Sequence, residues 1–178
     1  MSAPPLRAIT DEEVAAFHRD GAVLLDKVLP AEWADLARRG LDAAIATPDV
    51  MSGHLGPLRV DQFPAARTPE LRQFIDESPL AQIVGITMNG PVRFYMDQLF
   101  AKPPGMVPPT AWHQDTCYYN ADGHDLIRAW VSPDPVPREL SLEVVRGSHL
   151  WNTTYRPLAG RDPGRDPDAR RLLAGGGP

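Results

Sequence analysis

Hydrophobic and polar positions in the first part of the chain follow the spacing and boundary signals of helices. The sequence Thr10-Asp11-Glu12-Glu13 is a capping box, and it predicts a short helix that ends near Gly21, where a left-handed residue is easily placed. The compact apolar run Ala22–Leu25 predicts a strand. A second helix is expected from about Ala31 to Ala46, because Thr47-Pro48 stops it. The opening of the chain is therefore predicted to be mainly helical.

Further along, the pattern changes from helical to strand-like. Thr68-Pro69-Glu70 and Ser78-Pro79 each place a capping residue before a proline, which predicts two short helices, the second closed by Gly90. From Val92 to Ala101 the residues alternate between two faces, which predicts a strand. One face of this strand is expected to be apolar and buried and to carry Val92, Phe94, Met96, Gln98 and Phe100.

The remaining sequence predicts short strands separated by turns. These strands are expected at Trp112–Thr116, Leu126–Ser132 and Leu140–Val145. Segment 153–178 is polar and glycine-rich, and it is expected to be a flexible loop. Helices followed by antiparallel strands indicate an α+β fold with a sheet or barrel, and residues 1–178 are expected to form a single domain.

Composition narrows the class of function. The 178 residues are 43% hydrophobic and 23% charged, as in an ordinary globular domain, and the formal net charge is −5. The chain has no block of Lys and Arg that would indicate binding to nucleic acid or to an anionic membrane. No apolar run approaches the length of a membrane span, and the N-terminus lacks the basic region followed by an apolar run that is typical of a signal peptide. A small-molecule partner is therefore expected. The single cysteine, Cys117, excludes an intrachain disulfide and favours a reducing cytoplasm.

The densest group of chemically active residues is Trp112-His113-Gln114-Asp115. In a strand, residues two apart point to the same side, so His113 and Asp115 would present an imidazole and a carboxylate to one point. This spacing suits two of the three ligands in a 2-His-1-carboxylate triad, which leaves positions open on Fe(II). Taken alone, the short motif favours a surface histidine hydrogen-bonded to an aspartate over a metal site, and only its context reverses this preference.

That context is a series of motifs in a fixed order. Trp112-His113-Gln114-Asp115 with Tyr118 is followed by Arg128-Ala129-Trp130 and then by Val145-Arg146-Gly147-Ser148-His149, and it is preceded by the stretch from Asp97 to Gly105. Together with the helix, Asp-Gly and apolar segment near the N-terminus, this series resembles the phytanoyl-CoA dioxygenase family from about Thr10 to Asn152.

The resemblance implies a double-stranded β-helix (a cupin-like jelly roll) with N-terminal helices packed outside it. It also implies Fe(II), with 2-oxoglutarate as co-substrate, O₂ and a small organic substrate. Such an enzyme is a dioxygenase that hydroxylates the substrate while 2-oxoglutarate is decarboxylated to succinate and CO₂. Because Asp115 is present, hydroxylation is expected in preference to the halogenation performed by relatives that lack this carboxylate.

Individual residues can be matched to the family pattern. His113 and Asp115 match the first two metal ligands, Gln98 and Trp130 match positions that line the 2-oxoglutarate pocket, and Lys102 matches a lysine common in the family. Two of these residues have an alternative interpretation from the strand pattern alone. Gln98 would also be satisfied by a hydrogen bond to a neighbouring strand, and most tryptophans in strands belong to the core.

The family pattern also includes a late histidine and an arginine beyond it, which pairs with the far carboxylate of 2-oxoglutarate. His149 of the Gly-Ser-His turn is expected to be structural, and no histidine follows it. The arginines after it lie in polar sequence without strand character: Arg156, Arg161, Arg165, Arg170 and Arg171. The domain is therefore expected to be incomplete at its C-terminus, with closing strands and a third ligand missing. The alternatives are a catalytically degenerate member that only binds a small molecule, or a third ligand among His18, His54 and His124.

Overall fold

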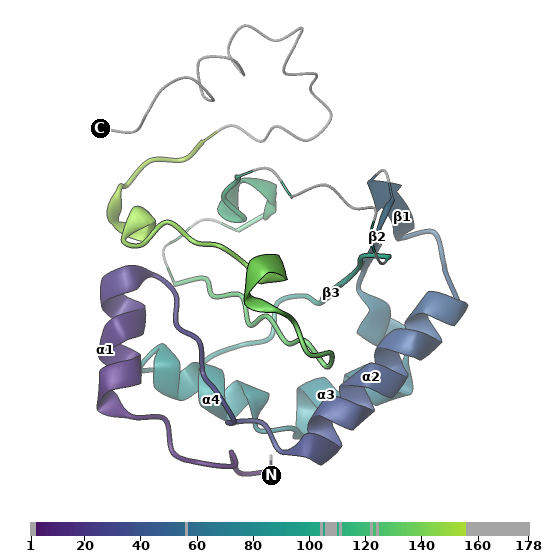
Figure 1. The fold of residues 1–178 in the computed structure, drawn as a ribbon, viewed down its shortest axis with the longest axis horizontal. Helices are drawn as coiled ribbons and strands as arrows, with labels where there is room; N and C mark the ends of the chain where they lie inside the picture. Colours follow the sequence, from purple (N-terminus) through teal and green to yellow (C-terminus); the bar gives the residue numbers. More distant parts are fainter. Residues whose placement is uncertain are drawn as a thin grey trace, which may run out of the picture. The chain divides into compact units, whose positions relative to one another are not determined.

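The computed structural model describes residues 3–55, 57–103, 105, 110, 112–121, 123 and 125–155. The chain divides into two compact units. The larger unit combines Met1–Pro108 with Ile127–Trp151, and the smaller unit combines Pro109–Leu126 with Asn152–Pro178. The α-helices and strands that Figure 1 labels belong to the larger unit.

The predicted helices form where their boundary signals lie. Helix α1 (Asp11–Asp20) begins with the capping box: the Thr10 hydroxyl accepts a hydrogen bond from the Glu13 amide at 3.2 Å, and the Glu13 carboxylate accepts one from the Thr10 amide at 2.9 Å. The helix ends at Gly21, whose φ of 79° lies in the left-handed region. Helix α2 (Ala31–Ala46) has the predicted bounds.

The two proline-initiated helices are also confirmed. Helix α3 (Pro69–Glu77) begins with its proline. Helix α4 (Leu80–Thr87) begins directly after Pro79, which is its N-cap residue. The predicted end at Gly90 was too late, because α4 stops at Thr87. Within the described ranges, every helix is too short or too polar to span a lipid bilayer.

Helices α2 and α3 lie side by side (Figure 1). Leu36, Ala37 and Phe74 are buried between them. Gly40 permits this close packing, since a Cβ atom there would lie 2.7 Å from the Leu71 Cγ atom. A second buried cluster, formed by Ala44, Ala65, Leu71 and Leu99, joins these helices to the sheet.

The described residues contain one antiparallel sheet of three strands in the order β1-β2-β3. Strand β1 (Ser52–Leu55) pairs with β2 (Leu58–Gln62), and β2 pairs with β3 (Gln98–Ala101). Val60 lies opposite Phe100, and Gln62 lies opposite Gln98. The β1–β2 hairpin was not predicted.

The strand predictions were otherwise largely wrong. Ala22–Leu25 does not form a strand, and of the segment Val92–Ala101 only Gln98–Ala101 does. Its buried face is also opposite to the predicted one: Leu99 is 3% exposed, whereas Phe94 is 48% exposed. Alternation specifies two faces but does not say which of them meets the core.

Later in the chain, no strand forms at Trp112–Thr116, Leu126–Ser132 or Leu140–Val145. Two of these segments lead into or out of 3₁₀ turns instead, at Thr116–Tyr118 and Arg138–Leu140. A strand needs a hydrogen-bonded partner, and the side-chain pattern alone does not supply one. The double-stranded β-helix therefore stays an expectation. The predicted loop 153–178 lies outside the described residues from position 156 onward.

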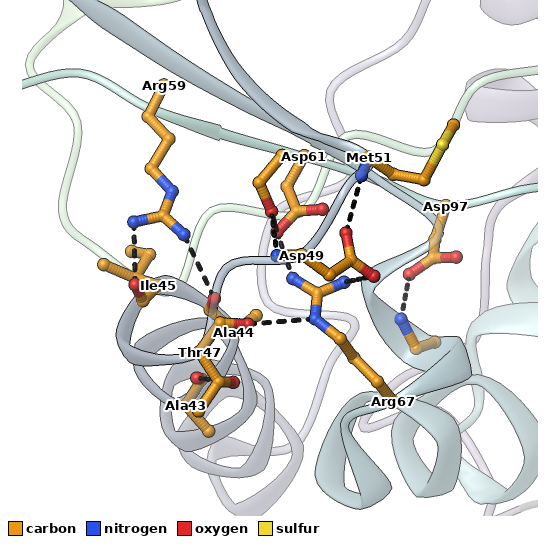
Figure 2. A network of polar contacts seen from close by, with 12 residues as sticks. Ala43, Ala44, Ile45, Thr47, Asp49, Met51, Arg59, Asp61, Arg67 and Asp97 are labelled. Atoms are coloured by element: carbon orange, nitrogen blue, oxygen red, sulfur yellow. Dashed lines mark hydrogen bonds and ion pairs between the residues drawn. The ribbon is translucent and has the colours of Figure 1, made fainter.

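A polar network fixes the β1–β2 hairpin to the end of α2 (Figure 2). Asp61 of β2 is fully buried, and its Oδ2 atom pairs with the Arg67 guanidinium and accepts a hydrogen bond from the Ser52 hydroxyl at 3.0 Å. The Arg67 Nε atom donates to the Thr47 carbonyl at 3.1 Å, just beyond the last turn of α2. Arg67 also lies 3.5 Å from the Asp49 carboxylate. One guanidinium thus connects the strand, the helix end and the loop between them.

The same region anchors the start of β3. The Asp97 carboxylate accepts a hydrogen bond from the Ala65 amide at 2.8 Å, as Figure 2 shows, and the Asp97 carbonyl accepts one from Phe63 at 3.0 Å. Burial raises the pKa of Asp97 above its ordinary value. These contacts hold the residue directly before Gln98.

The Gly-Ser-His turn packs on the end of α1. The Gly147 amide donates to the Asp20 carbonyl at 2.9 Å, and the His149 Nε2 atom lies 3.1 Å from the His18 carbonyl. Gly21 leaves room for this contact, because a Cβ atom there would lie 2.4 Å from the His149 ring. The turn thereby satisfies carbonyls that the helix end leaves unpaired.

Candidate functional site

His113 and Asp115, in the smaller unit, face each other. The His113 Nε2 atom lies 3.3 Å from the Asp115 Oδ1 atom, and the two side chains are 39% and 33% exposed. The predicted strand is not the cause of this approach. Asp115 has φ −70° and ψ −35°, so the backbone turns at this residue and enters the 3₁₀ turn Thr116–Tyr118. The side chains meet because the chain bends, and the reasoning from strand spacing was wrong.

The residue between them anchors the segment. The Gln114 side chain donates through Nε2 to the Thr153 carbonyl at 2.9 Å and accepts through Oε1 from the Tyr155 amide at 2.9 Å. A side-chain amide thus pairs with two backbone groups of a distant segment. Sequence reasoning missed this role, because no local pattern signals a partner so far along the chain.

The neighbouring turn completes the surroundings of the pair. Tyr118 meets the His113 ring edge-on, with ring centroids 6.2 Å apart, and its amide donates to the Asp115 carbonyl at 2.9 Å. The Cys117 thiol donates to the Gln114 carbonyl at 2.8 Å, and burial raises the pKa of this thiol. The thiol is therefore held in its protonated form near neutral pH.

The donor atoms of His113 and Asp115 fit a shared metal ion. Ligand atoms about 2.1 Å from a metal and about 90° apart around it are separated by about 3 Å. The 3.3 Å between Nε2 and Oδ1 is close to this separation. The same distance also suits a direct hydrogen bond, the alternative that the motif left open.

A third ligand is not found in the part of the chain that the structure describes, where no three His, Cys, Asp or Glu side chains are grouped to hold a metal. Of the histidines considered as alternatives, His54 lies in β1 and His18 near the end of α1. His124 lies outside the described residues.

Three further predicted site residues belong to the larger unit. The Gln98 Oε1 atom accepts a hydrogen bond from the Arg128 Nη2 atom at 2.6 Å, so its partner is an arginine and not a neighbouring strand. Trp130 stacks on Phe100 with ring centroids 5.5 Å apart, and it is 49% exposed, unlike a core tryptophan. Lys102 is exposed and follows β3 directly. Sequence reasoning assigned no role to Arg128, although it stands two residues before Trp130.

Comparison with known proteins identifies the family. The model of the family described as phytanoyl-CoA dioxygenase (PhyH) matches residues 7–170. The chain belongs to this family. Members of the phytanoyl-CoA dioxygenase family are cupin-like jelly-roll proteins that are typically dependent on Fe(II) and 2-oxoglutarate. No curated protein and no solved structure matches the chain.

Proposed function

We propose that this member of the phytanoyl-CoA dioxygenase family is an Fe(II)/2-oxoglutarate-dependent oxygenase that hydroxylates a small organic molecule. The observation that supports it most directly is the pair of donor atoms on His113 and Asp115, 3.3 Å apart, inside the range that the family model matches. A reducing cytoplasm suits this function, because Fe(II) and the thiol of Cys117 both persist there.

In this proposal residues of the smaller unit hold the metal. His113 and Asp115 are two of the three protein ligands. Tyr118 limits rotation of the His113 ring, and Gln114 fixes the backbone from which both ligands project. When bound, Fe(II) with 2-oxoglutarate and O₂ supplies the oxidising power for C–H hydroxylation, and 2-oxoglutarate leaves as succinate and CO₂. The protein orients the reactants and excludes water.

Gln98, Trp130 and Lys102 are proposed to line the pocket for 2-oxoglutarate. The amide, the indole ring and the ammonium group would supply hydrogen bonds, apolar contact and positive charge to a dicarboxylate.

The test is metal binding by residues 1–178 with Mn(II), which replaces the oxidation-prone Fe(II) and can be followed by electron paramagnetic resonance. His113→Ala and Asp115→Ala are each expected to weaken binding at least about tenfold, since each removes a ligand. Glu12→Ala removes an exposed carboxylate of α1 that is not among the proposed ligands, and it serves as the control. Equal affinities for the wild type and the two ligand variants would refute the metal assignment.

A second function is favoured by one observation, namely that the described residues group no third ligand with this pair. A member of the family without a complete triad would bind a small molecule and not turn it over. Release of succinate from 2-oxoglutarate in the presence of Fe(II) separates the two functions. Succinate formed by the wild type but not by His113→Ala supports the oxygenase, whereas carboxylate binding without succinate formation supports the binding protein.

A further inference from the structure

The side chain of Gln114, the residue between His113 and Asp115, is held by two hydrogen bonds to one distant segment. Its Nε2 atom donates to the Thr153 carbonyl at 2.9 Å, and its Oε1 atom accepts from the Tyr155 amide at 2.9 Å. These contacts join residues that are 39 and 41 positions apart in the sequence, and both segments lie in the smaller unit. We call this pair of hydrogen bonds the Gln114 clamp.

The Gln114 clamp has the hydrogen-bond pattern of a parallel β-bridge. In such a bridge, a residue donates to the carbonyl before its partner and accepts from the amide after it. The Gln114 side chain does the same on either side of Thr154. Turning the amide over would place its NH₂ group against an N–H and its oxygen against a carbonyl, so one orientation alone satisfies both partners. The contact is therefore specific to an amide, because an ionised carboxylate only accepts and an ammonium group only donates.

The main chain on either side of this amide is fixed as well. The Cys117 thiol donates to the Gln114 carbonyl at 2.8 Å, and the Tyr118 amide donates to the Asp115 carbonyl at 2.9 Å. These two bonds are local and hold the turn itself, whereas the Gln114 clamp ties the turn to residues 153–155. A segment bonded in both ways has few backbone conformations left to it.

This restraint acts on the donor atoms of the proposed ligands. The His113 Nε2 atom and the Asp115 Oδ1 atom lie 3.3 Å apart, on the residues directly before and after Gln114. The backbone of Gln114 therefore sets the directions in which both side chains leave the chain. With the Gln114 clamp formed, the donor atoms are already ordered, so less conformational entropy is lost when a metal ion binds.

We propose that Gln114 is a positioning residue for the metal, and that the Gln114 clamp and the bound metal stabilise each other. The proposal rests on the proposed function, because it takes His113 and Asp115 as metal ligands. It adds that residues 153–155, which are not proposed as ligands, become more ordered when the metal binds. By linkage, the factor by which the clamp raises metal affinity equals the factor by which the metal stabilises the clamp.

The first measurement is the Mn(II) affinity of residues 1–178, followed by electron paramagnetic resonance in the wild type and in Gln114→Met. Methionine keeps an unbranched side chain but forms neither hydrogen bond of the clamp. We expect binding to weaken about tenfold, the lower end of the effect of groups that hold a metal ligand in place, because Gln114 acts through the backbone. Gln73→Met is the matched control: it removes an exposed amide of α3 that donates to the Glu77 carboxylate at 2.9 Å, and it should leave Mn(II) affinity unchanged.

The second measurement separates a positioning role from a purely structural one. It follows hydrogen exchange of the Tyr155 amide by mass spectrometry of overlapping peptides. In the wild type, saturating Mn(II) should slow this exchange by the same factor of about ten, as linkage requires, whereas a purely structural clamp would protect the amide equally with and without Mn(II). In Gln114→Met the amide should exchange faster than in the wild type, with no slowing by Mn(II).

Because the exchange measurement is made on the wild type, it stays decisive even if Gln114→Met folds poorly. Two results would overturn the proposal: Mn(II) affinities of the wild type and Gln114→Met within twofold of each other, or exchange of the Tyr155 amide in the wild type that Mn(II) leaves unchanged. If His113→Ala and Asp115→Ala still weaken Mn(II) binding, either result overturns the coupling and leaves the metal assignment intact. Absence of Mn(II) binding by the wild type would overturn both.

Discussion

Arg67→Met is expected to lower the free energy of unfolding more than the other substitutions considered below. Methionine keeps an unbranched side chain but lacks the guanidinium that pairs with Asp61 and donates to the Thr47 carbonyl. Asp61 is 0% exposed, so its charge would stay buried without a cation. The remaining contact of its Oδ2 atom is the Ser52 hydroxyl at 3.0 Å, which is a neutral donor.

The size of the effect follows from burial. Removing one partner of a buried ion pair costs about 3–5 kcal/mol, because an uncompensated charge is left behind. The Arg67 side chain is 20% exposed, so water can enter where it leaves, and the lower end of that range, about 3 kcal/mol, is expected. Small domains have free energies of unfolding of about 5–15 kcal/mol and urea m-values of about 1–3 kcal/mol/M, which makes the shift in the urea midpoint about 1–3 M.

Urea unfolding followed by circular dichroism and by tryptophan fluorescence measures this change. Asp61→Asn in the Arg67→Met background removes the buried charge while keeping an oxygen for Ser52, and it should recover most of the lost stability. Arg72→Met is the matched control: it breaks the exposed pair with Asp76 in α3, and it should leave the urea midpoint nearly unchanged.

The reasoning would be refuted by a loss below about 1 kcal/mol in Arg67→Met, the value typical of a surface ion pair. A double variant no more stable than Arg67→Met alone would also refute it. Either result would mean that Asp61 is not held as a buried charge by Arg67.

Two further predictions concern the same core. In an ordinary helix, replacing glycine by alanine is stabilising by about 1 kcal/mol. In Gly40→Ala, however, the new Cβ atom would lie 2.7 Å from the Leu71 side chain, and overpacking costs about 1–3 kcal/mol. The variant should therefore be less stable than the wild type in urea, and a gain in stability would contradict this. Asp97→Asn concerns a carboxyl whose pKa is raised by burial, so its contribution to stability is present below the unfolded pKa and is lost as the pH rises through the folded pKa. The unfolding temperature of Asp97→Asn should therefore rise relative to the wild type between about pH 4 and pH 7. A pH-independent difference between the two proteins would exclude a raised pKa at Asp97.

The helices were predictable because their signals are local. The capping box at Thr10 and the proline at position 69 act on backbone groups within one turn, so the neighbouring residues alone determine where each helix begins. Helix α2 was predicted with its observed bounds for the same reason.

The sheet was not predictable in the same way, since strand pairing joins distant segments. Strand β3 pairs with β2, which lies far before it in the sequence, and only Gln98–Ala101 of the alternating segment finds a partner there. The Gly56-Pro57 sequence is a turn signal that pointed to the β1–β2 hairpin, and it was overlooked. Which face is buried was decided by Leu99 meeting the core cluster on α2 and α3, a tertiary contact that alternation does not encode.

In the candidate site, too, the local features could be predicted from the sequence and the contacts between distant segments could not. His113 and Asp115 are close in sequence, so the motif identified both, even though a turn and not a strand brings them together. The partners that stabilise the predicted residues come from elsewhere: Gln114 is held by the backbone near Thr153, and Gln98 by Arg128.

A facial triad likewise combines local and distant residues: two ligands are close together in the sequence, and the third comes from a distant segment. Spacing can therefore nominate the adjacent pair but not the third ligand, whose identity depends on how the chain folds. Substitution of His113 or Asp115 tests the local half of the proposed metal site. A third ligand from a distant segment would add to the metal affinity of the wild type. The affinity of the wild type for Mn(II), compared with the affinities of the two variants, therefore tests whether such a ligand is present.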